Sequence, residues 1–180
     1  EPTEGYDIHT TININFQDIV HNSLLEQVEK YEAEYGTAVL MEVETGDVKA
    51  IANLGITSSK TYFEKLNYAV GRSEEPGSTF KLMSIIAALE DGVLKPSDLI
   101  DTGNGERTIY GKKVKDSRKG GYGQIEASKV FEVSSNTGIV KIIYDNYKNN
   151  PKKFVDRLYN MRLHRPLNIS IKGEAVPKIP

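Results

Sequence analysis

Residues 75–90 read EPGSTFKLMSIIAALE, a segment in which a turn is followed by an apolar run. The Pro-Gly pair at 76–77 predicts a turn, and an apolar run begins directly after it. A helix is therefore predicted from Ser78 to about Leu89 or Glu90. Because it is apolar on almost every side, we expect it to be a buried, central helix.

The spacing of Ser78 and Lys81 places both side chains on one face of this helix. A lysine amine that burial keeps partly neutral can take a proton from a nearby hydroxyl. Free N–H groups at the helix start favour an oxyanion beside that hydroxyl. The pair thus predicts a Ser–Lys acyl-transfer site. The competing interpretation is a capping serine and a solvated lysine, because about one S-x-x-K is expected by chance in a chain of this length.

A second polar group, Ser134-Ser135-Asn136, lies between two predicted helices, Glu126–Val133 and Thr137–Tyr147. The Ser134 hydroxyl can relay a proton, and the Asn136 amide can both donate and accept toward a peptide backbone. The alternative is that Ser135 or Asn136 merely caps the following helix.

The remaining periodicity predicts a mixed α+β chain, with an antiparallel hairpin and a helical half. Alternation predicts a strand at Thr10–Phe16, and a helix follows from Asp18 until Gly36. The other predicted elements are hairpin strands at Thr37–Val43 and Val48–Leu54, loops at 55–67 and 101–123, a helix near Pro151–Met161 and an extended tail from Leu163 to Pro180.

Composition excludes several classes of protein. The 180 residues carry a net charge of −2 and no cysteine, which argues against a nucleic-acid binder and excludes thiol chemistry. The three histidines have no zinc-binding spacing. The glycine pairs near 103 and 121 lack the rest of a nucleotide-binding frame, and the basic run Lys112–Lys119 is interpreted as a solvated loop. No signal peptide is evident, and no apolar run approaches the roughly 20 residues that span a bilayer.

The combination of E-P-G-S-T-F-K with the later S-S-N-T-G resembles the transpeptidase domain of class B penicillin-binding proteins, whose signature set includes S-x-x-K and an S-x-N triplet. The hairpin at 36–52 is similar to the family's opening hairpin. The resemblance covers about Thr10 to Pro180. The sequences of the segments Asn67–Val70 and Val130–Tyr147 are most similar to the cell-division member of the family in Bacteroidetes.

The resemblance implies a D,D-transpeptidase that cross-links peptidoglycan stem peptides ending in D-Ala-D-Ala and is acylated by β-lactams. It implies Ser78 as the nucleophile, Lys81 as the general base and Ser134 as the proton relay. It also implies that Asn136 binds the amide of the substrate. It also implies no metal or cofactor, a membrane-anchored place on the periplasmic face of the inner membrane, and divisome partners. Further substrate-binding residues implied are Thr79, Ser135 and Thr137.

The chain departs from the family pattern because it contains no K-T-G or K-S-G. We therefore expect residues 1–180 to form one partial transpeptidase domain of the penicillin-binding-protein and serine β-lactamase fold, with an incomplete sheet. Its parts would be 10–54, 78–161 and the tail 162–180. Such a fragment would be inactive or weakly active, and its exposed sheet edge would favour self-association.

Two other functions remain open on the residues alone. A class D-like β-lactamase or a β-lactam sensor domain also uses S-x-x-K, and rapid release of the acyl group would favour the hydrolase. A non-catalytic binding module is the other alternative.

Overall fold

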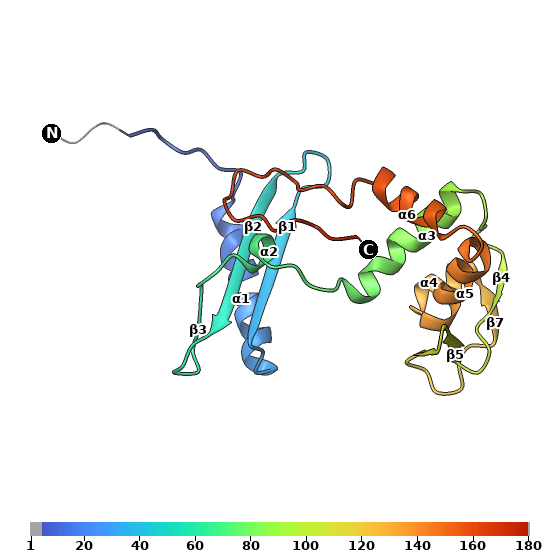
Figure 1. Cartoon of the computed structure of the whole chain (residues 1–180). Coiled ribbons are helices and arrows are strands. Elements are labelled where there is room, and N and C mark those ends of the chain that lie inside the picture. The colour runs from blue at the N-terminus through green and yellow to red at the C-terminus, as the bar shows by residue number, and fades with distance from the viewer. Residues whose placement is uncertain (1–4, 180) are drawn as a thin grey trace. The chain divides into compact units, whose positions relative to one another are not determined.

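The computed structural model describes residues 5–179, which form two compact units (Figure 1). Unit 1 runs to Ser73 and also includes Pro166–Val176. Unit 2 comprises Glu74–Arg165 and the residues from Pro177 onward. Each of the predicted site residues lies in unit 2.

Unit 1 begins with the helix α1, Ile14–Lys30, so the predicted strand at Thr10–Phe16 is wrong. Asn13 is the reason, because its side-chain oxygen accepts hydrogen bonds from the amides of Asn15 and Phe16 at 3.0 and 3.2 Å. An asparagine in this position caps a helix and satisfies its first free N–H groups. The alternation that suggested a strand spans an extended lead-in and the first helical turn.

The sheet of unit 1 confirms the predicted hairpin. Strand β1, Tyr35–Met41, pairs antiparallel with β2, Val48–Ile56, in a register that places Ala38 opposite Ala52. A third strand, β3 at Tyr62–Phe63, pairs with β2 inside the segment predicted as loop. The sheet order is β1–β2–β3, so β1 is an edge strand.

Helix α1 packs along β1 and β2 (Figure 1). The buried apolar side chains of this unit are small or branched, which allows the helix to lie close to the sheet. They are Val28, Ala50, Ala52 and Leu54. A short helix, α2 at Tyr68–Gly71, follows, and the amide of Ala175 in the tail donates to the carbonyl of Val70 at 3.0 Å. From Leu163 to Ile179 the tail has no helix or strand.

Unit 2 contains the four helices predicted from Ser78 onward. They are α3 at Phe80–Glu90, α4 at Ala127–Glu132, α5 at Asn136–Tyr147 and α6 at Pro151–Asn160. One apolar cluster holds them together through small and branched side chains. Its buried members are Ala88, Leu94, Ile100, Ala127, Val130, Ile139 and Ile142. In residues 5–179, no helix combines the length and apolar character needed to cross a membrane.

Helix α3 is less enclosed than its composition predicts. Ser84, Ala87 and Ala88 are buried, whereas Leu82 and Leu89 are exposed. The expectation of a helix buried on every side is therefore wrong for this structure. Met83, Ile85 and Ile86 are half-buried.

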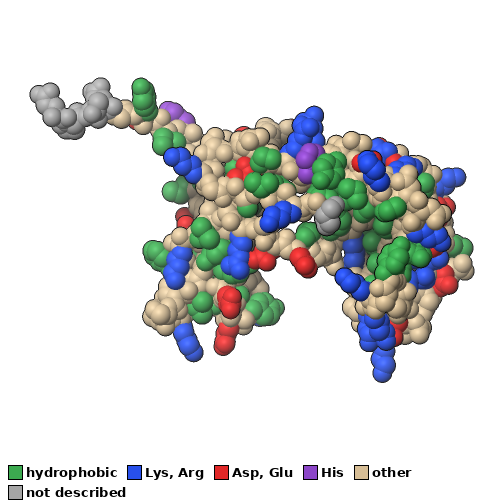
Figure 2. Space-filling model, viewed as in Figure 1, with side chains coloured by type: hydrophobic (Ala, Val, Ile, Leu, Met, Phe, Trp, Pro, Cys, Tyr) green, Lys and Arg blue, Asp and Glu red, His purple; other side chains and the backbone are tan. Residues whose placement is uncertain are grey.

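Part of the predicted loop at 101–123 forms strands. Strand β4, Leu99–Asp101, pairs with β7, Gln124–Glu126, and β5, Glu106–Ile109, pairs with β6, Lys112–Lys115. The first half of the basic run Lys112–Lys119 is thus the strand β6 and not a loop. Figure 2 shows Lys and Arg side chains gathered over this part of unit 2.

Two details explain why this segment folds. Glu106 forms ion pairs with Lys113 at 2.5 Å and with Lys115 at 3.0 Å across the hairpin. Gly105 and Gly121 cross so closely that a Cβ on Gly105 would lie 2.7 Å from the Cα of Gly121. Only glycine allows two backbones to approach in this way.

Candidate active site

Ser78 lies in a 3₁₀ turn, Gly77–Thr79, which leads into α3. Its side chain is exposed, and Lys81 follows it in the first turn of α3. The hydroxyl of Thr79 donates to the carbonyl of Pro76 at 2.6 Å, and this hydrogen bond stabilises the turn. The sequence therefore presents Ser78 at the mouth of the helix, where a nucleophile needs to be accessible.

Lys81 reaches a serine that lies 53 residues away in the chain. Its amine donates to the Ser134 hydroxyl at 2.8 Å and to the Ser134 carbonyl at 2.6 Å. Burial lowers the pKa of Lys81 below its ordinary value of 10.5, and the carboxylate of Asp116 opposes this by raising it. A half-buried amine with a lowered pKa is suited to exchanging protons with hydroxyl groups beside it.

Ser134 has a backbone conformation that is unusual for a residue with a side chain. Its φ is 54°, in the left-handed region. It ends α4 as the residue after the C-cap: its amide donates to the Phe131 carbonyl at 3.0 Å, and the Ser135 amide donates to the Val130 carbonyl at 2.9 Å. This pair of bonds is a Schellman motif, in which glycine usually holds the position of Ser134. Strained positions of this kind cluster at functional sites.

Ser135 and Thr137 point inward rather than into solvent. Their exposed fractions are 1% and 0%. Both hydroxyls bond to the carboxylate of Asp116, at distances from 2.7 to 3.1 Å. Their burial argues against direct substrate contact, and it indicates that they fix the turn around Ser134.

Asn136 opens α5 and is half-buried. Its side-chain amide donates to the carbonyl of Lys115 at 2.7 Å, which ties it to the end of β6. The side-chain oxygen is the part of this group that remains for an incoming donor.

The structure thus joins Lys81 to Ser134 and ties Asn136 to the end of β6, and it places Ser78 one helical turn before Lys81. The residue that sequence reasoning missed is Asp116. It is the one acid inside the basic run Lys112–Lys119, and that isolation is the only signal in the sequence that could have marked it.

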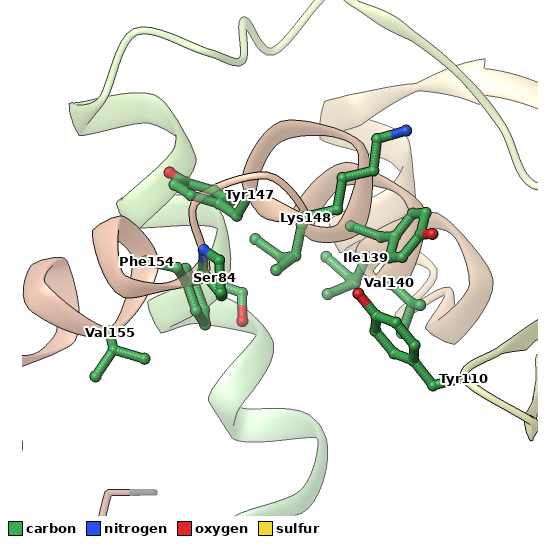
Figure 3. A pocket seen from close by; sticks show the side chains of 11 residues that line it. Ser84, Tyr110, Ile139, Val140, Tyr147, Lys148, Phe154 and Val155 are labelled. Carbon is green, nitrogen blue, oxygen red and sulfur yellow. The ribbon is translucent and has the colours of Figure 1, made fainter.

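A separate cavity of about 370 Å³ lies among α3, α5 and α6 (Figure 3). Its lining is mostly aliphatic and aromatic, and none of the predicted site residues contributes to it. The lining includes Ser84, Tyr110, Ile139, Tyr144, Tyr147, Lys148 and Phe154. This cavity is distinct from the Ser–Lys group.

Comparisons with known proteins agree with this geometry. Residues 36–177 match the family model described as the penicillin binding protein transpeptidase domain. The chain is 29% identical over 175 residues to the peptidoglycan D,D-transpeptidase FtsI of Escherichia coli, covering 94% of the chain and 29% of the relative. It is also 29% identical over 155 residues to the stage V sporulation protein D of Bacillus subtilis, covering 78% and 23%. The chain therefore spans less than a third of the length of these curated relatives.

Solved structures show the same fold. The TP domain of penicillin-binding protein 3 from Burkholderia pseudomallei superposes with a TM-score of 0.77 at 26% identity, over 96% of this chain and 48% of that one. A peptidoglycan glycosyltransferase from Burkholderia ambifaria gives a TM-score of 0.78 at 26% identity, over 96% and 50%. The α+β transpeptidase fold expected from the sequence is confirmed. By its residues, its fold and these matches, the chain belongs to the penicillin-binding protein transpeptidase family.

Proposed function

We propose that the chain carries the serine–lysine part of the active site of a peptidoglycan D,D-transpeptidase. The observation that carries this proposal is the hydrogen bond between Lys81 and the Ser134 hydroxyl. It joins the S-x-x-K and S-x-N groups, which lie far apart in the sequence, into one proton-exchanging pair. The E. coli relative, named a peptidoglycan D,D-transpeptidase, supports the same reaction.

In the proposed first step, the Ser78 hydroxyl attacks the carbonyl of the penultimate residue of a D-Ala-D-Ala stem peptide. Its proton passes to the neutral amine of Lys81. The amide of Ser78, at the start of the helix, donates to the oxyanion that forms. The C–N bond then breaks, and the leaving D-alanine amine takes a proton that Lys81 supplies through Ser134.

In the second step, the amine of a neighbouring stem attacks the ester on Ser78. The attacking amine loses a proton along the same route, and Ser78 regains its hydroxyl proton. The products are a cross-linked peptide and the free enzyme. In this reaction Asn136 holds the substrate amide. No metal or cofactor takes part in the proposed steps.

A β-lactam tests this proposal because it acylates the same nucleophile. The natural protein that carries the chain is incubated with a penicillin and weighed by intact-protein mass spectrometry. We expect one adduct on the wild type and none on Ser78→Ala. The control is Ser97→Ala, which changes an exposed serine outside the site and should also carry one adduct. A wild type without an adduct would refute the function. Release of the adduct within seconds would instead indicate a serine β-lactamase.

The finer features of this function are also our proposal. We infer a role in cell division, of the type found in Bacteroidetes, with divisome partners and a place on the periplasmic face of the inner membrane. The similarity at Asn67–Val70 and Val130–Tyr147 supports this subtype. Depletion of the protein is expected to give long, undivided cells; rounded cells would instead indicate a role in elongation.

For the 180-residue chain itself we propose little or no cross-linking activity, and self-association through β1. The absence of a K-T-G sequence supports the first statement. The edge position of β1 supports the second.

A further inference from the structure

The carboxylate of Asp116 is the shared acceptor for the segment 135–137. The Ser135 hydroxyl lies 3.1 and 3.0 Å from its two oxygens. The Thr137 amide donates to one oxygen at 2.9 Å, and the Thr137 hydroxyl donates to the other at 2.7 Å. Three donors from one short segment therefore converge on a single side chain.

Asp116 is itself held in place. It follows β6 directly, and its amide donates to the carbonyl of Gly105 at 2.9 Å. The preceding residue, Lys115, accepts the side-chain amide of Asn136 at 2.7 Å. Two consecutive residues of the hairpin thus contact the segment that carries the S-x-N group.

These contacts stabilise the backbone around Ser134 and satisfy an amide at the start of α5. The left-handed backbone of Ser134 persists only if its surroundings hold it, because that conformation is costly for a residue with a side chain. The Thr137 amide is one of the N–H groups at the start of α5 that no helical carbonyl can satisfy. A carboxylate at this end of a helix is also electrostatically favourable.

We propose that Asp116 is the positioning residue of the site, whose carboxylate locks residues 134–137 so that the Ser134 hydroxyl meets Lys81 and Asn136 keeps its orientation. This inference rests on the proposed acyl transfer and adds a residue to it. Asp116 touches neither the substrate nor the reacting atoms. It acts through Ser135 and Thr137.

Asp116 also has an electrostatic effect on the base. Among residues 5–179, it is the one charged group that shifts the pKa of Lys81, and it raises it against the effect of burial. Removing this charge without changing the shape of the side chain should lower the pKa of Lys81 further. The rise of the acylation rate with pH should then move to lower pH, which a purely structural role would not cause.

The test compares Asp116→Asn, Asp116→Ala and the control Asp156→Ala in the natural protein that carries the chain. Within residues 5–179, Asp156 forms its ion pair with Lys152 on the surface of α6. The rate of acylation by a fluorescent penicillin is measured across pH. We expect Asp116→Ala to slow acylation by on the order of 100-fold, because small misplacements at a reacting centre cost about that much. Asp116→Asn should lower the plateau rate about 10-fold and shift the profile to lower pH, because neutral hydrogen bonds are roughly half as strong as charge-assisted ones.

Hydrogen exchange of the amides at 134–138 is measured on the same variants without any penicillin. We expect faster exchange in both Asp116 variants and no change in Asp156→Ala. The proposal would be overturned if Asp116→Asn had the same acylation rate across pH as the wild type and the same rate of hydrogen exchange at 134–138. If the wild type is not acylated at all, the proposed function fails, and the exchange result alone decides whether Asp116 holds the turn.

Discussion

At the scale of single residues, the clearest feature is the conflict between stability and chemistry at Ser134. A left-handed residue after a helix is normally glycine, yet this position carries a hydroxyl that bonds to Lys81. The side chain therefore costs stability and supplies the contact that the proposed reaction uses. Such a trade is common at functional positions.

Replacing Ser134 by glycine should reveal this conflict directly. We expect Ser134→Gly to be more stable than Ser134→Ala by up to about 1 kcal/mol, because only the alanine retains the strained Cβ. Both variants should be acylated slowly, since both lack the hydroxyl. Urea unfolding and penicillin labelling measure the two effects, and equal stability of the two variants would contradict the assigned strain.

Lys81 should control the pH dependence of acylation. Its pKa is lowered by burial, so the neutral amine appears at lower pH than for an exposed lysine, and the rate should rise with a midpoint below 10.5. Lys81→Arg remains protonated at all accessible pH values and should lose at least about 100-fold in rate. Lys141→Arg, in α5 and paired with Asp145, is the matched control. A wild-type midpoint at or above 10.5 would be evidence against Lys81 as the base.

At the scale of elements, unit 2 is held together by a polar connection between α3, α5 and α6. Asp91, just after α3, has a side chain that is only 2% exposed. It accepts from the Tyr147 hydroxyl at 2.8 Å and from the Arg157 guanidinium, whose Nε lies 2.9 Å away. Burial raises the pKa of Asp91, but the bonds from Arg157 and Tyr147 outweigh it, and the pKa ends below 3.8.

Tyr147→Phe removes one of these bonds without changing the shape of the core. We expect a loss of about 2 kcal/mol in the free energy of unfolding, the usual worth of a hydrogen bond to a charged group. Thermal or urea unfolding measures it. Tyr159→Phe, on the exposed side of α6, should have little effect on the free energy of unfolding. An equal loss in this variant would show that the contact between Tyr147 and Asp91 does not stabilise the fold.

The same carboxylate predicts an acid dependence. Because the folded pKa of Asp91 is lowered, its contribution to stability is complete above the unfolded value of about 3.9 and is lost as pH falls through the folded value. Asp91→Asn should be less stable than the wild type at pH 7, and the difference should shrink at pH 2 to 3. A constant difference across this range would contradict the shift.

The elements that could be predicted from the sequence are those whose pattern is local. Helices α3 to α6 and the β1–β2 hairpin follow from periodicity and turn residues within each segment. Strands β4 to β7 could not be predicted in this way, because their pairing depends on the Gly105–Gly121 crossing and on ion pairs across the hairpin. The spacing of Ser78 and Lys81 is also local, whereas the Lys81–Ser134 contact and the role of Asp116 depend on how distant segments meet.

At the scale of the whole molecule, β1 remains an open edge in the described residues, and three of its own side chains, Val39, Leu40 and Met41, are exposed. An edge with apolar side chains recruits strands from other copies. We expect the 180-residue chain to associate with rising concentration in analytical ultracentrifugation. Val39→Lys should weaken this several-fold, and Val43→Lys, in the turn beyond the strand, should not. A wild-type chain that stays monomeric at high concentration would contradict the proposal.

The crossing of Gly105 and Gly121 has a genetic consequence. The carbonyl of Gly105 holds the amide of Asp116, so any side chain at either glycine would displace the segment on which the Ser134 turn rests. In a saturation-mutagenesis library selected for growth, these two positions should tolerate change as poorly as the nucleophile itself. Among survivors selected on a penicillin, partial defects at positions 105 and 121 are expected, because these glycines act on the Ser134 turn through Asp116.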